Sequence, residues 1–129
     1  MMQHKIVSHF LDGRILKGVT CNFRPERSSF HMQLDNTGEQ VEVHVDELKS
    51  VFFVKDLVGN KDYQERQEVE RRGYGRRLKV KFVDGETIVG YTQGYSPDRP
   101  GFFMAPADPE SNNDRIFVVQ TSTEAVNLL

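Results

Sequence analysis

Basic and aromatic side chains are concentrated in the segment ERRGYGRRLKVK, residues 70–81. Along an extended strand, alternation would place Arg77, Lys79 and Lys81 on one face and the apolar residues between them on the other. Guanidinium and ammonium groups bind phosphate, and a neighbouring aromatic ring can stack on a base. The segment therefore predicts either a nucleotide or nucleic-acid site or, more simply, a solvated charged face. The candidate ligand-binding residues are Arg71, Arg72, Tyr74, Arg76, Arg77, Lys79 and Lys81.

A second group of candidates lies in two similar loops, FRPERSSFH at 23–31 and YSPDRPGFF at 95–103. Pro25 and Pro97 suit the second position of a type I turn, where the ring already has the required φ angle. The simplest interpretation is a stiff loop whose flanking aromatic residues pack over one end of the fold. Binding is the alternative, and the candidate residues for it are Arg27, Tyr95, Arg99 and Phe103.

Residues that would indicate catalysis or a metal are missing. The acidic segment PADPESNNDR, residues 106–115, lacks the EF-hand spacing and its closing glutamate. No nucleophile elbow, phosphate-binding loop or dinucleotide fingerprint occurs in the chain. We therefore predict no catalytic residues, no metal and no cofactor.

Composition narrows the class of protein further. The 129 residues carry a net charge of −2 and a single cysteine, Cys21, which excludes an internal disulfide and fits a reducing compartment. No apolar run approaches the roughly 18–20 residues that would span a bilayer. These features predict a cytoplasmic protein that does not enter a membrane.

The two similar loops belong to an internal repeat. Residues 4–34 align with 76–106 at an offset of 72, and nine positions are identical. Three additional residues in the second copy shift the offset to 75, so that VEVHVDELKSVFFV aligns with IFVVQTSTEAVNLL. The repeat predicts two units, residues 1–54 and 76–129, joined by a charged linker at 55–75 that is either a tether or a short helix over 61–72.

Each unit has the pattern of five short strands. KIVSHF and RLKVKF alternate with period two, and both are followed by an Asp-Gly dipeptide typical of tight hairpins. The next strands, predicted over 15–23 and 87–95, are interrupted by Gly18 in the first copy and by Gly90 and Gly94 in the second. Glycines inside a strand indicate a sharp bend or a bulge. Five strands with a strongly bent second strand suit a small closed barrel, which leaves no exposed edges.

This pattern resembles the Sm-like barrel. The resemblance is carried by F-L-D-G-R-x-x-x-G, F-H-M-x-L and V-x-V-x-x-x-L-x-x-V in the first copy, and by similar segments in the second. It implies an Sm- or SH3-like fold and raises RNA binding as one alternative. Gln33 and Ala105 stand where RNA-binding members usually have asparagine, and this argues against a uridine site.

Two other resemblances concern function. Arg72-x-x-x-Arg76 resembles the arginine motif of PilZ domains, which implies cyclic di-GMP binding, but the second PilZ motif is absent. The segments GRR, DGE, GY-x-P-x-RPGFF, PADP-x-SNN and R-x-FVV resemble an uncharacterised bacterial domain family without an assigned activity. Its domains often accompany signalling modules.

The resulting prediction is an all-β fold of two tandem five-strand Sm/SH3-like small barrels that form a pseudo-dimer, related by an approximate twofold axis and joined by the charged linker. The hydrophobic endings VFFV and VNLL would contribute to the contact between the barrels. We expect a non-enzymatic interaction module of a bacterial cytoplasmic protein, associated with signalling and recognising an unknown protein partner. A nucleotide or cyclic-dinucleotide receptor that uses residues 71–81 and an Sm-like RNA binder are the alternatives, and copies of the chain could associate through barrel edges.

Overall fold

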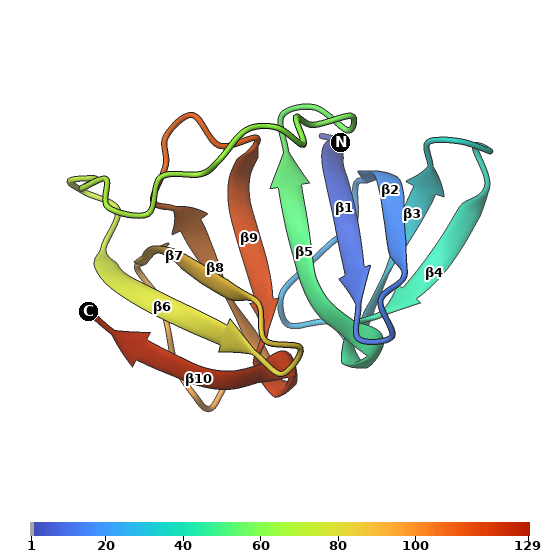
Figure 1. The fold of residues 1–129 in the computed structure, drawn as a ribbon. Helices are drawn as coiled ribbons and strands as arrows, with labels where there is room; N and C mark the ends of the chain where they lie inside the picture. The colour runs from blue at the N-terminus through green and yellow to red at the C-terminus, as the bar shows by residue number, and fades with distance from the viewer. Residues whose placement is uncertain (1) are drawn as a thin grey trace.

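The computed structural model describes residues 2–129 as an all-β protein with almost no helix. Ten antiparallel strands and two short 3₁₀ helices follow one another along the chain (Figure 1). The elements are β1 His4–Phe10, β2 Ile15–Thr20, β3 Ser29–Leu34, β4 Gln40–His44, η1 Val45–Glu47, β5 Leu48–Val54, β6 Arg76–Phe82, β7 Thr87–Thr92, β8 Gly101–Pro106, β9 Asn113–Val119, η2 Gln120–Ser122 and β10 Thr123–Leu128.

The Asp-Gly dipeptides form the predicted hairpin turns. Gly13 and Gly85 have φ angles of 95° and 94°, a region that residues with a Cβ rarely adopt. Their N–H groups donate to the carbonyl oxygens of Phe10 and Phe82, at 3.1 and 2.9 Å. The turns therefore connect β1 with β2 and β6 with β7 in the same way.

Strand pairing also repeats along the chain. His4 pairs with Thr20 in the first half, and Arg76 pairs with Thr92 in the second, each position shifted by 72. Phe30 pairs with Val43, and the corresponding Phe102 pairs with Val118. Equal registers place residues that align in the sequence at equivalent positions of the sheet, so the two halves can be compared residue by residue.

The two halves join edge to edge in one open sheet. Its strand order is β10-β6-β7-β8-β9-β5-β1-β2-β3-β4, and the β5–β9 pairing forms the joint at the centre of Figure 1. A twofold arrangement would pair strands of the same kind, whereas β5 and β9 are the fifth and fourth strands of their halves. The VFFV segment lies in this joint as predicted. The VNLL segment does not, because β10 lies at the outer edge and leaves Leu128 46% exposed.

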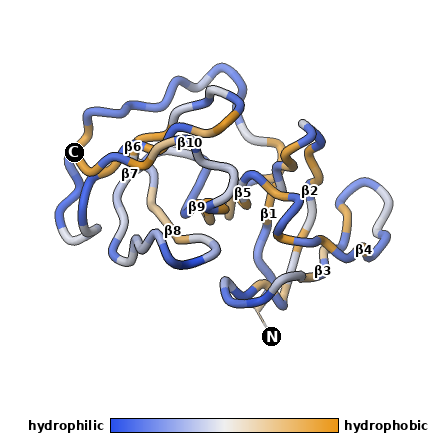
Figure 2. The backbone as a smooth tube through the Cα atoms, turned by 90° about the horizontal axis from the view of Figure 1, so that it is seen from below, coloured by the Kyte–Doolittle hydropathy of each residue, from blue (hydrophilic) through white to orange (hydrophobic). Residues whose placement is uncertain are grey.

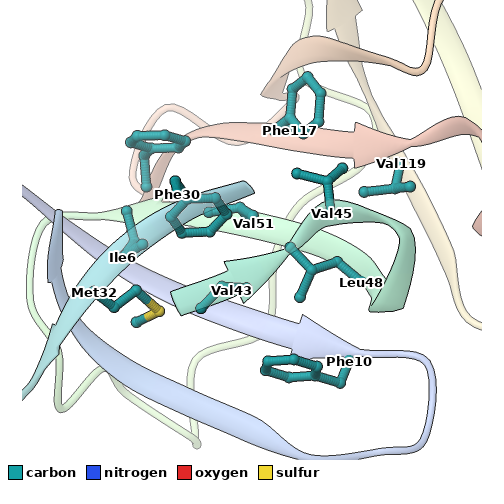
Figure 3. Packing of buried hydrophobic residues seen from close by; sticks show 11 residues of the cluster. Ile6, Phe10, Phe30, Met32, Val43, Val45, Leu48, Val51, Phe117 and Val119 are labelled. Carbon is teal, nitrogen blue, oxygen red and sulfur yellow. The ribbon is translucent and has the colours of Figure 1, made fainter. Parts of the chain in front are cut away.

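Strand β9 supplies side chains to the cores of both halves. Phe117 and Val119 pack with Ile6, Phe30 and the other buried residues of the first half (Figure 3). Their neighbours Ile116 and Val118 point to the opposite face and pack in the core of the second half. The strands carry most of the hydrophobic residues and the loops most of the hydrophilic ones (Figure 2). The joint is therefore continuous with both cores.

The linker at 55–75 contains no helix, so a helix over 61–72 is a wrong expectation. Apolar residues are too sparse there for a helix to bury a hydrophobic face, and side-chain contacts hold an irregular backbone instead. The linker runs beside the loop between β8 and β9 (Figure 1), where it meets Asp108. The Asp108 carboxylate accepts hydrogen bonds from the Tyr63 hydroxyl and from the backbone N–H groups of Arg66 and Glu110. The Arg66 guanidinium donates to the same carboxylate at 2.9 Å.

Asp108 is expected to make folding stability depend on pH in acid. Its hydrogen bond and ion pair with Arg66 hold the pKa of the buried carboxyl well below its ordinary value of 3.8. The stabilising contribution is present above that ordinary pKa and is lost as the pH falls through the folded-state pKa. Asp108→Asn should therefore lower the melting temperature at pH 7 and weaken its pH dependence between about pH 5 and about pH 2. Thermal denaturation across this range measures both effects, with the exposed Asp35→Asn as control; an equal pH dependence in all three proteins would contradict the prediction.

Candidate functional site

A hollow lined by charged and aromatic side chains lies where β7 and β8 diverge, and we call it the β7–β8 pocket. It has a volume of about 400 Å³, within the range of small-molecule and side-chain sites. Both strands, the Tyr74 ring and Pro25 from the first half contribute to its wall. The residues that matter for its chemistry are Tyr74, Tyr91, Gly94, Arg99, Phe103 and Arg115.

The gap between β7 and β8 arises because their pairing is short. Only Gly90 with Pro106 and Tyr91 with Ala105 are in register. Beyond them the Thr92 hydroxyl donates to the Phe103 carbonyl oxygen at 2.8 Å, in place of a backbone ladder. β7 therefore ends at Thr92, and β2 ends at Thr20, which bonds the His31 carbonyl oxygen at 2.7 Å. The strands predicted over 15–23 and 87–95 are shorter than expected for this reason.

The first half fills the equivalent gap with its own side chain. The Asn22 Oδ1 atom accepts a hydrogen bond from the backbone N–H of His31 at 2.9 Å, and the Asn22 amide nitrogen lies 3.1 Å from the His31 ring. The hollow that remains between β2 and β3 has a volume of only about 140 Å³. Asn22 thus occupies the space between these two strands.

Glycine takes the place of Asn22 in the second half. Gly94 keeps the same backbone position, since its N–H donates to the Thr92 hydroxyl at 3.3 Å as that of Asn22 donates to the Thr20 hydroxyl at 3.4 Å. A Cβ added at Gly94 would meet no atom within 4 Å. The larger volume of the β7–β8 pocket is therefore partly a consequence of one missing side chain.

The pocket combines positive charge with aromatic surface. The Arg115 guanidinium lies over the rings of Phe53 and Phe103, at 4.2 and 4.5 Å from their centroids. Burial lowers the pKa of this guanidinium, and the neighbouring Asp114 opposes that shift. Within residues 2–129, neither Arg115 nor Arg99 has a carboxylate oxygen within 4.0 Å. The arrangement suits a ligand that carries a negative charge beside an apolar group.

The loop candidates divide between this pocket and its surroundings. Arg99 and Phe103 line the β7–β8 pocket, while Tyr95 lines a neighbouring hollow of about 460 Å³. Arg27 is exposed on the first-half loop. The predicted turns are present, since the N–H groups of Arg27 and Arg99 each donate to the carbonyl oxygen three residues earlier. The flanking aromatic residues pack on each other edge to face, with centroids 5.0 Å apart for Phe23–Phe30 and 4.9 Å for Tyr95–Phe102.

The basic segment 71–81 does not form one continuous site. Arg71 donates to the carbonyl oxygen of Pro106 and stacks on Tyr74, and Arg77 donates to the carbonyl oxygen of Gln67. Lys81 pairs with Glu124 at 3.0 Å. The remaining members are Tyr74, which lines the β7–β8 pocket, Arg76, which lines the neighbouring hollow, and Arg72 and Lys79, which are exposed.

Two residues of the pocket, Arg115 and Gly94, are not among the binding residues predicted from the sequence. Arg115 lies in β9, far from the basic segment along the chain. The β5–β9 joint places it beside Phe53, and the β8–β9 pairing places it beside Phe103. Gly94 does leave a signal, because the alignment of the two copies places it opposite Asn22. A glycine that replaces a hydrogen-bonding side chain at an equivalent position indicates a site that one copy fills and the other leaves open.

Fold and pocket together define the chain as an all-β protein with one ten-stranded antiparallel sheet. Over the described residues, neither 3₁₀ helix has the length and apolar character to cross a membrane, and no cluster of three metal-ligating side chains occurs. The chain belongs to a family of unknown function, DUF6982, whose family model matches residues 2–129. No curated protein and no solved structure matches it.

Proposed function

We propose that this chain is a non-enzymatic binding module that recognises a protein partner, and that a segment of the partner enters the β7–β8 pocket. The observation that carries the proposal is the difference between the halves. The same strand gap is occupied by Asn22 in the first half and left open by Gly94 in the second. A side chain of the partner would fill the second gap as Asn22 fills the first.

The free edges of the sheet are a weaker candidate for the partner-binding site than the β7–β8 pocket. β4 and β10 are the terminal strands, and edges of this kind can pair with another chain. β4 presents the exposed polar residues Gln40, Glu42 and His44 at positions where β9 carries residues such as Phe117 and Val119. Polar side chains at these positions protect an edge from association. For this reason we assign the partner to the pocket rather than to an edge or to a second copy.

Nucleotide or cyclic-dinucleotide binding at residues 71–81 is the second candidate, and RNA binding rests on the same basic side chains. Arg72, Arg76 and Lys79 are exposed and available for phosphate. Against this candidate, Arg71 and Arg77 bond to backbone carbonyl oxygens and Lys81 bonds to Glu124. Three of the six basic groups would have to exchange protein contacts for ligand contacts.

The architecture that we propose for the module is two small barrels of the Sm or SH3 type in one chain. Its support is the repeated strand order, β5-β1-β2-β3-β4 and β10-β6-β7-β8-β9. In both halves the second strand carries a glycine against the third strand, Gly18 against Gln33 and Gly90 against Ala105. We place the module in a bacterial cytoplasmic protein associated with signalling, as the composition and the sequence resemblances suggest.

Substitutions at Gly94 test the proposed function. Immobilised wild-type protein, Gly94→Ala and Gly94→Asn would be exposed to a lysate of the organism that encodes the chain, and retained proteins would be identified and then titrated in purified form. We expect a partner that binds wild type and Gly94→Ala, and that binds Gly94→Asn roughly tenfold more weakly or worse, because asparagine fills the gap.

A partner with equal affinity for all three proteins would overturn the assignment to the pocket. A cyclic dinucleotide that raises the melting temperature of wild type, but not of Arg72→Ala/Arg76→Ala, would favour the second candidate instead.

A further inference from the structure

We infer that the β7–β8 pocket binds a carboxylate group of the partner, with the backbone N–H of Phe103 and the Arg115 guanidinium as its donors. The inference rests on the proposed function, because it names the chemical group that enters the same pocket. In the first half the side chain of Asn22 already occupies the equivalent place.

Asn22 shows which kind of atom the gap between the strands accepts. Its side-chain oxygen receives the N–H of His31, while the Thr20 hydroxyl donates to the carbonyl oxygen of the same residue. In the second half the Thr92 hydroxyl donates to the Phe103 carbonyl oxygen in the same way. Because the registers of the two halves agree, the N–H of Phe103 corresponds to that of His31.

The Phe103 N–H has no side chain of this kind to bond. Gly94 has no side-chain oxygen, and the register between β7 and β8 stops at Tyr91 and Ala105. Phe103 and Gly94 both line the pocket. An oxygen atom of a bound ligand can therefore take the place that Asn22 Oδ1 has in the first half.

Charge then distinguishes a carboxylate from a neutral amide. The residue that corresponds to Arg115 in the first half is Gln40. In the first half, therefore, the gap holds the neutral Asn22 side chain next to a neutral glutamine. In the second half the open gap lies next to the cationic Arg115. Arg115 is held against Phe53 and Phe103 and lacks a carboxylate partner within the described chain. A guanidinium held in this way forms stronger hydrogen bonds with a charged acceptor than with a neutral one.

Aromatic walls indicate what accompanies the carboxylate. Tyr74, Tyr91 and Phe103 line the same pocket as the donors, and the volume of about 400 Å³ admits one apolar side chain together with a carboxylate. The group could be the C-terminal carboxylate of an apolar residue or the side chain of an acidic residue. Both sources share the same chemistry, and separate probes distinguish them.

Titration of ¹⁵N-labelled protein with small probes tests the inference directly. The probes are N-acetyl-phenylalanine, its neutral amide, and N-acetyl-aspartic acid α-amide, which carries a side-chain carboxylate. We expect a carboxylate probe to shift the amide resonance of Phe103 and to bind roughly tenfold more tightly than the neutral amide, as a charge-assisted hydrogen bond would provide. The stronger of the two acids identifies the source of the carboxylate.

Three variants complete the test. Val83→Ala, at an exposed position outside the pocket, should bind the preferred acid as wild type does. Gly94→Asn should not bind it, and Arg115→Gln should reduce the preference for the acid over the amide. Equal binding of acid and amide, or acid binding that Gly94→Asn leaves intact, would overturn the inference. If a partner protein is lost in Gly94→Asn while no acid shifts Phe103, the carboxylate inference is wrong and the proposed function stands.

Discussion

Phe117→Ala should lower the free energy of unfolding by about 3–5 kcal/mol, the range for removing a fully buried phenylalanine. Phe117 belongs to β9 but is completely buried in the core of the first half. Its ring meets those of Phe23 and Phe103 edge to face, with centroids 5.1 and 5.2 Å apart. Alanine would leave a cavity at the joint between the halves, where strand pairing limits how far the neighbours can close it.

Denaturant unfolding monitored by circular dichroism measures the loss. Phe117→Leu retains most of the buried volume and should lose less than Phe117→Ala. Val83→Ala removes an exposed side chain and should change stability by no more than about 0.5 kcal/mol. A loss below about 1 kcal/mol for Phe117→Ala would mean that β9 does not anchor the first half in the way described.

Gly90→Ala is expected to destabilise the fold by about 1–3 kcal/mol, because the added methyl group has no space. Its Cβ would lie 2.3 Å from the carbonyl oxygen of Ala105 and 2.6 Å from the Met104 methyl group. The methionine side chain can turn away, but the carbonyl oxygen belongs to β8 and moves only with the strand. The substitution would therefore separate β7 from β8 at the end of their short ladder.

Gly94→Ala is the matched control, four residues further along the chain. A Cβ at Gly94 meets no atom within 4 Å, so the substitution should change stability by no more than about 0.5 kcal/mol. Thermal and denaturant unfolding of the two variants under identical conditions decide the comparison. Equal stability of Gly90→Ala and wild type would contradict the prediction, because it would show that the space between Gly90 and the Ala105 carbonyl oxygen is large enough for a methyl group.

Gly90 and Gly94 show that a sequence pattern can locate a glycine without revealing its role in the tertiary structure. Gly90 and Gly94 were both expected to mark a bend or bulge in one strand. In the structure Gly90 lets the backbone of Ala105 come close, and Gly94 lies beyond the end of β7. Gly94 makes no such close backbone contact, and its effect is to leave open the space that a side chain would fill. That space exists only because β7 and β8 separate after Thr92, a tertiary property that no local pattern reports.

The predicted binding residues likewise differ in ways that only the tertiary structure reveals. Tyr74, Arg99 and Phe103 come from two separate sequence segments, and the structure brings them into one pocket. Arg71 and Arg77 appeared equally suited to binding, yet their guanidinium groups bond to backbone carbonyl oxygens of the linker and of β8. The number of basic residues in a segment does not reveal which of them already have partners.

The amino-acid sequence by itself determined the repeat, the all-β class, the hairpin turns at Gly13 and Gly85, and the proline turns. Each depends on interactions between residues close along the chain, such as the positive φ angle that favours glycine. Only the tertiary structure decided that β5 pairs with β9, that Asp108 holds the linker, and that Arg115 lies beside the gap opened by Gly94. These features depend on which strands meet and which polar groups are buried together, and such contacts join residues that are distant in the sequence.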